Sequence, residues 1–195
     1  MISIEVTEEL REQANEHGYG LSEDYDRSPK ERDFDGYVGD LGELAFKRIL
    51  EEKTSFDYEY LGGIDEADFV VDGHTVDIKT RTVIDDDKRD LIVPTDLDGG
   101  FHDFYLLLRC VYAEDDYETF DRHERTIEAL EFIGLWDSAT VERVSQPFCP
   151  PSARGRMSKN YRETVICDYG THADLMDFAS LMDSQEQAQQ AQSAD

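Results

Sequence analysis

The chain has 195 residues, 39% of them hydrophobic, so it is long enough to bury a core and is expected to fold as a globular protein. Its 46 Asp and Glu against 19 Lys and Arg give a formal net charge of −27, spread along the chain. No apolar run reaches membrane-span length and no signal-peptide pattern opens the sequence, so we expect a cytoplasmic protein. Its three cysteines form no C-x-x-C pair, which argues against a disulfide framework and a structural zinc site.

The acidic excess predicts a salty environment. A diffuse acidic surface repels itself at low ionic strength, whereas about 1 M salt shortens the Debye length to about 3 Å. We therefore expect a halophilic source, an archaeon or one of its viruses. An acidic mimic of nucleic acid, or a chaperone-like acidic protein, is the alternative explanation of the charge.

The N-terminal region is predicted to hold two helices. A short polar helix is expected over residues 7–17 with Thr7 as its N-cap, followed by a Gly-, Ser- and charge-rich loop over residues 18–32. Apolar residues at helical spacing predict a longer helix over about residues 35–52. Gly39 and Gly42 inside it each cost about 1 kcal/mol relative to Ala, which predicts that the backbone there closely approaches another element.

A strand over residues 56–60 and a β-hairpin over residues 67–80 are expected next. Asp72-Gly73 is a strong signal for a two-residue type I′ turn, because both residues tolerate positive φ. Hairpin pairing that is symmetric about this dipeptide places Asp68 directly opposite Asp77, and Lys79 on the same face as Asp77. Two facing carboxylates repel each other unless a cation lies between them, and a hard divalent cation suits them.

Three segments after the hairpin are predicted to be strands, over residues 91–93, 104–112 and 127–135. The second of these is nearly continuously apolar and is expected to be a buried central strand. A short helix is expected over 138–144, a Pro-rich basic loop over 147–161 and a helix after Thr171. This order of elements predicts an α/β or α+β fold with a mixed central β-sheet.

We expect a single domain over residues 1–183, with its core at about 35–145. Residues 184–195 are rich in Gln, Ala and Ser and are expected to form a disordered tail.

Three ordered motifs resemble the PD-(D/E)XK nuclease superfamily, most closely its small phage- and archaeal-type members. They are Gly42-Glu43-x-Ala45 in the longer helix, Ala67-Asp68-Phe-Val-Val in the first hairpin strand and Asp77-Ile-Lys79 in the second. The resemblance covers roughly residues 35–145 and implies a restriction-endonuclease-like core. The chain lacks the Pro that commonly precedes the first Asp, and it has no Q-x-x-x-Y motif of RecB-like nucleases.

The resemblance implies a metal-dependent deoxyribonuclease with Glu43, Asp68, Asp77 and Lys79 as its catalytic set. Asp68 and Asp77 would bind Mg²⁺ or Mn²⁺ with the Ile78 carbonyl, and Glu43 would be a further or water-mediated ligand. Lys79 would orient the attacking water and stabilise the developing charge. Considered alone in a chain this acidic, Glu43 is better explained as an ordinary exposed residue of an amphipathic helix.

DNA is the substrate that the resemblance implies. Phosphate contacts are expected from the one basic island of the chain and from Arg81, which follows the motif. The DNA-binding candidates are Arg81, Arg154, Arg156, Lys159, Tyr161 and Arg162. A surface loop whose cations merely offset neighbouring acids explains the island equally well.

Two other functions are alternatives to a nuclease. One is a non-catalytic DNA-binding or protein-interaction module that kept the fold, and the other is an acidic DNA mimic. The mimic ranks lower because it needs no Asp, Asp and Lys on one hairpin face. The sequence leaves open the mode of cleavage, the number of metals and the oligomeric state, for which a homodimer is one option.

Overall fold

The computed structural model describes residues 3–16, 29–62, 67–82, 90–94, 102–116, 121–144, 146–148 and 161–165. The helices are α1 (Glu8–Glu16), α2 (Pro29–Lys53) and α3 (Ser138–Val144), with 3₁₀ turns η1 (Glu114–Asp116) and η2 (Arg122–Glu124). The strands are β1 (Ser3–Glu5), β2 (Tyr58–Tyr60), β3 (Phe69–Val71), β4 (His74–Arg81), β5 (Asp90–Pro94), β6 (Phe104–Tyr112), β7 (Ile127–Asp137), β8 (Gln146–Phe148) and β9 (Tyr161–Val165). None of the described helices combines the length and the apolar character needed to cross a membrane.

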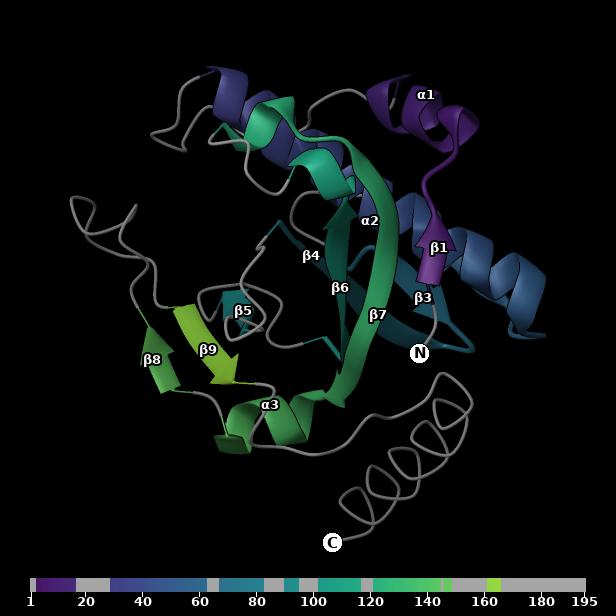
Figure 1. Ribbon diagram of the computed structural model, residues 1–195. Coiled ribbons are helices and arrows are strands. Elements are labelled where there is room, and N and C mark those ends of the chain that lie inside the picture. The colour runs from purple at the N-terminus through teal and green to yellow at the C-terminus, as the bar shows by residue number, and fades with distance from the viewer. Residues whose placement is uncertain are drawn as a thin grey trace, which may run out of the picture.

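Six strands form a large mixed sheet in the order β1-β7-β6-β4-β3-β2 (Figure 1). The β4–β6 pair is parallel and every other pair in this sheet is antiparallel. The mixed α/β class is therefore confirmed, and so is the central position of β6. The strand β6 is apolar throughout its first five residues because both of its faces are covered there.

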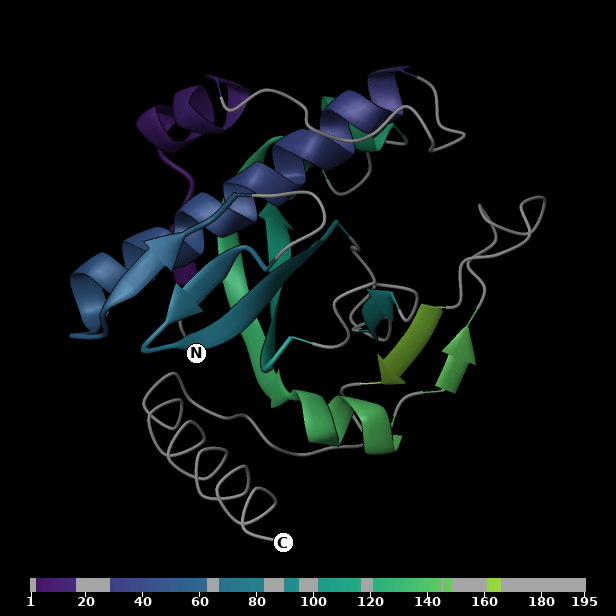
Figure 2. The same ribbon diagram turned by 180° about the vertical axis from the view of Figure 1, so that it is seen from behind.

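Helix α2 lies across one face of the large sheet (Figure 2). Its apolar residues pack with those of β3, β4 and β6 into the main core, which includes Leu41, Phe46, Phe69, Val76 and Ile78. The Phe46 and Phe69 rings meet edge to face, with centroids 5.2 Å apart. The helix thereby holds the hairpin and the parallel pair in one rigid unit.

The opposite face of the large sheet carries a second, smaller core. Strands β5, β9 and β8 form a three-stranded antiparallel sheet beside the large one (Figure 1). Leu91 and Val93 of β5 are buried with Tyr105 and Leu107 of β6 and with Trp136 of β7. A short strand at residues 91–93 was expected, but its assignment to a separate sheet was not.

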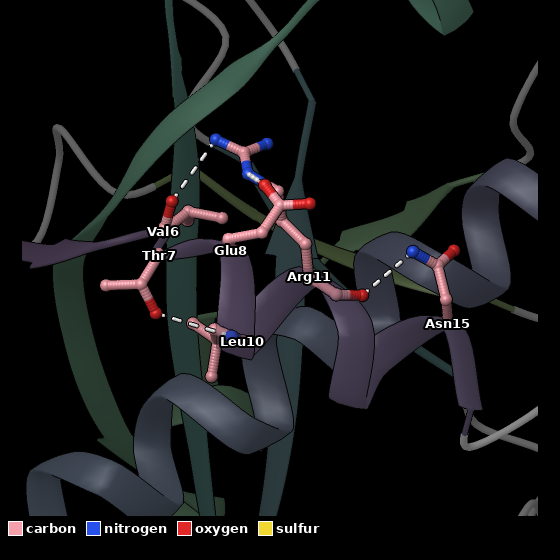
Figure 3. A network of polar contacts seen from close by, with 6 residues as sticks. All are labelled: Val6, Thr7, Glu8, Leu10, Arg11 and Asn15. Atoms are coloured by element: carbon pink, nitrogen blue, oxygen red, sulfur yellow. Dashed lines mark hydrogen bonds and ion pairs between the residues drawn. The ribbon is translucent and has the colours of Figure 1, made fainter.

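The polar helix α1 begins where its sequence predicts. Thr7 is the N-cap, and its Oγ1 accepts a hydrogen bond from the Leu10 amide at 3.3 Å (Figure 3). The Arg11 guanidinium donates to the Val6 carbonyl at 3.2 Å and ties the helix back to the segment that follows β1. Leu10 and Ala14 are the buried positions that pack into the main core.

The hairpin of β3 and β4 has the predicted turn and register. Asp72 and Gly73 both adopt positive φ, +46° and +87°, as a type I′ turn requires. Phe69 pairs with Val76 and Val71 pairs with His74. The Asp72 carboxylate accepts the Asp57 amide at 2.9 Å, which joins the turn to the segment before β2.

Several sequence predictions need correction. Helix α2 begins at Pro29, inside the expected loop, where a proline is well tolerated because the first helical amides lack intrahelical partners. Strand β1 was missed because its three residues are too few for a periodic signal. Pro147 and Phe148 lie in β8 although the expected loop was to begin at Pro147. The helix predicted after Thr171, the tail 184–195 and thus the full extent of the proposed domain lie outside the described residues.

Candidate active site

Strand β4 presents two chemically different faces. Val76 and Ile78 point into the main core, while Asp77 and Lys79 alternate with them and belong to the other face. The Asp77 side chain is only 9% exposed and the Lys79 side chain 31% exposed. A buried carboxylate in a strand that also serves the core calls for a stabilising partner.

The expected pairing of Asp68 with Asp77 is not part of the β3–β4 ladder. The β3–β4 ladder stops at the Phe69–Val76 pair, and Asp68 lies at a bend just before it. Its carboxylate accepts the Ile78 amide at 2.5 Å, and its carbonyl accepts the Leu61 amide at 2.9 Å. The Asp68 carboxylate is thus bound to the backbone of β4 at the residue that follows Asp77.

The buried carboxyl of Asp68 is easily protonated. Burial raises its pKa, and the neighbouring charges of Asp77 and Glu43 raise it further. Lys79 and the Ile78 amide lower the pKa only in part, and it remains raised to about 8. The group therefore behaves as a carboxylate that lacks sufficient positive charge around it.

Lys79 is the cation of this cluster. Its Nζ donates to Asp77 Oδ1 at 2.8 Å and lies 2.7 Å from Oδ2. Asp77 Oδ2 is buried and, although close to the ammonium, accepts no hydrogen bond of acceptable geometry from the described residues. Burial lowers the pKa of Lys79, but Asp77 and Asp68 outweigh it and the pKa ends above its ordinary value.

Glu43 reaches the same cluster from α2. Its carboxylate accepts the Tyr60 hydroxyl at 2.7 Å, and the Tyr60 ring lies on Phe69 with centroids 5.0 Å apart. Burial raises the pKa of Glu43, and its charge acts in turn on Asp68. The structure thus brings Glu43 close to the motif, as an ordinary exposed helix residue would not be.

Gly39 and Gly42 of α2 differ in their surroundings. A Cβ at Gly42 would overlap Thr80 Oγ1 of β4, so the predicted close approach is confirmed there. A Cβ at Gly39 would meet nothing within 4 Å, so the same prediction was wrong for Gly39. The close contact at Gly42 brings the adjacent Glu43 against the end of β4.

His102 and Tyr105 are neighbours of the cluster that sequence reasoning missed. Tyr105 pairs with Asp77 in the parallel register, and its hydroxyl accepts the His102 amide at 3.1 Å. Burial lowers the pKa of His102, with Asp77 and Lys79 among the charges that act on it. Neither residue belongs to a recognisable motif, and only the β4–β6 pairing reveals them.

The expected metal ligands come together only in part. Within the described residues, no three His, Cys, Asp or Glu side chains are grouped closely enough to hold a metal ion. Asp68 binds the Ile78 amide and Asp77 precedes Ile78 in β4, while Glu43 comes from α2, which packs on the apolar face of β4. The Ile78 amide contacts Asp68, whereas a role for its carbonyl stays a prediction.

The donors nevertheless suit a hard divalent cation. Two carboxylates are buried together, one with a raised pKa and the other with an oxygen that accepts no hydrogen bond among the described residues. Mg²⁺ commonly binds through one or two carboxylates and keeps several waters. The pair Asp68 and Asp77 fits that pattern.

Only three of the six expected DNA-binding residues lie within the described part of the chain. Arg81 lies on β4 two residues beyond Lys79, and its register neighbour is Arg109 of β6. Arg154, Arg156 and Lys159 lie outside the described residues. The backbone of Tyr161 and Arg162 lies in β9, so the basic segment ends in a strand and not, as expected, in a loop.

No protein-family model, no curated protein and no solved structure matches this chain.

Proposed function

We propose that the protein is a metal-dependent nuclease that hydrolyses phosphodiester bonds of DNA. The observation that carries this proposal is the buried pair of carboxylates around Ile78, with the Lys79 ammonium on one of them. Burying two acidic groups beside a lysine is unfavourable for folding alone, because each charge loses its hydration. Such an arrangement is typical of a site whose electrostatics serve chemistry.

Asp68 and Asp77 are the residues that would hold Mg²⁺ or Mn²⁺. When bound, such an ion lowers the pKa of a water and neutralises charge on the scissile phosphate. Asp68 is held in place by the Ile78 amide, so its carboxylate needs little reorganisation. Glu43 would complete the set through a water, with the Tyr60 hydroxyl fixing its orientation.

Lys79 would act as a donor and not as a base. The carboxylates around it raise its pKa, so it remains an ammonium at neutral pH. An ammonium has three N–H donors and no acceptor. It can therefore orient an attacking water or stabilise the charge that develops on the phosphate oxygens.

DNA is proposed as the substrate because cations continue from the site along one face of the large sheet. Lys79 and Arg81 are two residues apart on β4, so they lie on one face. Arg109, the register neighbour of Arg81, forms an ion pair with Glu131 and therefore adds less positive charge. A planar guanidinium can bind a phosphate through two parallel, bidentate hydrogen bonds. In a chain of net charge −27, a phosphodiester backbone needs such local positive charge.

A cleavage assay tests the proposal directly. Supercoiled and linear DNA would be incubated with the protein in about 1 M KCl, where self-repulsion is screened, with Mg²⁺, Mn²⁺ or a chelator. We expect metal-dependent cleavage by the wild type, and a loss of about 100-fold or more in Asp77→Asn. Asp72→Asn is the matched control, because it makes the same change at the turn of the same hairpin, where Asn also tolerates positive φ.

The outcomes separate the three functions. Metal-independent DNA binding without cleavage would favour the interaction module. Competition with DNA for a nuclease would favour the mimic. Equal cleavage by Asp77→Asn and the wild type would refute the site.

A further inference from the structure

The Lys79 ammonium occupies the position where a cation bound to both oxygens of Asp77 would lie. Its Nζ is 2.8 Å from Oδ1 and 2.7 Å from Oδ2, so it approaches both oxygens of the carboxylate. Asp77 is nearly buried, with 9% of its side chain exposed, so these oxygens have little other access to solvent. A divalent ion that binds both oxygens of this carboxylate would therefore have to displace the ammonium.

Lys79 is also the counter-charge of the acidic groups around it. The charge of Lys79 acts on Asp77, Asp68 and Glu43, and it relieves part of their mutual repulsion. One positive charge faces three acidic groups, so the neutralisation is partial and the pKa of Asp68 stays raised. The cluster is therefore stabilised by an internal cation but still attracts a stronger one.

We propose that Lys79 is a built-in competitor for the metal, so that a divalent cation binds Asp77 only when the ammonium moves off that carboxylate. The inference rests on the proposed function in one respect, the assignment of Asp77 as a metal ligand. Lys79 thereby regulates the metal affinity of the site.

The lysine is able to make this movement. Its side chain is 31% exposed and flexible, so the ammonium can leave Asp77 while the strand stays in place. The phosphate of a bound substrate offers it another anion. Substrate binding and metal binding then favour each other, because the phosphate draws the ammonium away from Asp77 and the metal releases the ammonium to the phosphate.

Measuring Mn²⁺ affinity tests the inference without any catalytic readout. Metal-free wild type, Lys79→Met and Lys53→Met would be titrated with Mn²⁺ in about 1 M KCl by calorimetry or by electron paramagnetic resonance. We expect Lys79→Met to bind Mn²⁺ about tenfold tighter than the wild type, because a hydrogen bond between charged groups no longer competes. Lys53→Met removes the same charge at the end of α2 and is expected to bind Mn²⁺ like the wild type.

A second variant guards against misfolding and against binding elsewhere. Lys79→Gln keeps a polar side chain and should also bind Mn²⁺ more tightly, while Lys79→Met combined with Asp77→Asn should lose the gain. Circular dichroism establishes that each variant is folded. Equal or weaker Mn²⁺ binding by both folded Lys79 variants would overturn the inference.

The two proposals fail separately. Tighter Mn²⁺ binding by the Lys79 variants, together with a wild type that cleaves no DNA, would refute the nuclease and keep the competitor. A wild type that cleaves DNA, together with unchanged Mn²⁺ affinity in the variants, would do the reverse.

Discussion

The two faces of β4 show how differently one strand can be used. On one face Val76 and Ile78 are buried in the main core beneath α2. On the other face Asp77 and Lys79 form an ion pair that is only partly open to solvent. The apolar face has its full explanation in folding, because burying hydrocarbon stabilises the sheet. The charged face has no such explanation, and that difference is what identifies the candidate site.

The apolar face should contribute most to stability. Phe69→Ala tests this, because Phe69 of β3 pairs with Val76 of β4 and lies in the same core. Phe69 is fully buried and contacts the rings of Phe46 and Tyr60. We expect the free energy of unfolding to fall by about 3–5 kcal/mol, the usual loss for a buried aromatic residue. Denaturant unfolding of the metal-free protein measures it. Val70→Ala, one residue along and only partly buried, should lose clearly less.

The charged face should oppose folding in a pH-dependent way. The folded-state pKa of Asp68 is raised from 3.8 to about 8, so the folded protein holds this proton more tightly than the unfolded chain. Its contribution to stability is complete below about pH 4 and is lost as the pH rises to about 8. We expect the loss to be about 1–3 kcal/mol, the cost of an incompletely satisfied buried group.

Thermal unfolding of the metal-free protein between pH 4 and 9 checks this expectation. Asp68→Asn carries no titrating carboxyl at this position. Its stability should therefore fall less between pH 4 and 9 than the stability of the wild type. Parallel curves for the two proteins would mean that Asp68 is charged in the folded state throughout this range.

The contact between α2 and β4 links the two faces, and it provides the smallest of the expected effects. Gly42→Ala should destabilise by about 1 kcal/mol, because overlap with Thr80 outweighs the gain in helix propensity. Gly39→Ala is the control and should stabilise by up to about 1 kcal/mol, since the space there is open. Combining Gly42→Ala with Thr80→Ala should recover much of the loss. Equal effects at the two glycines would show that α2 is not held against β4 at this point.

Local sequence signals predicted the elements that depend on neighbouring residues. The Asp72-Gly73 turn follows from the positive φ that these two residues tolerate. The N-cap at Thr7 follows from its hydroxyl, and the central position of β6 from its continuous apolar run. The start of α2, strand β1 and the small sheet escaped prediction because they depend on distant partners or on too few residues.

The sequence by itself determined which chemical groups are available, and the hairpin signal brought Asp68, Asp77 and Lys79 within one motif. Only the tertiary structure decided that the Asp68 carboxylate binds the Ile78 amide and that Glu43 is held by Tyr60, 17 residues away. The physical reason is that these contacts depend on a bend at the end of a ladder and on the close approach of α2. Neither feature produces a periodic residue pattern from which it could be predicted.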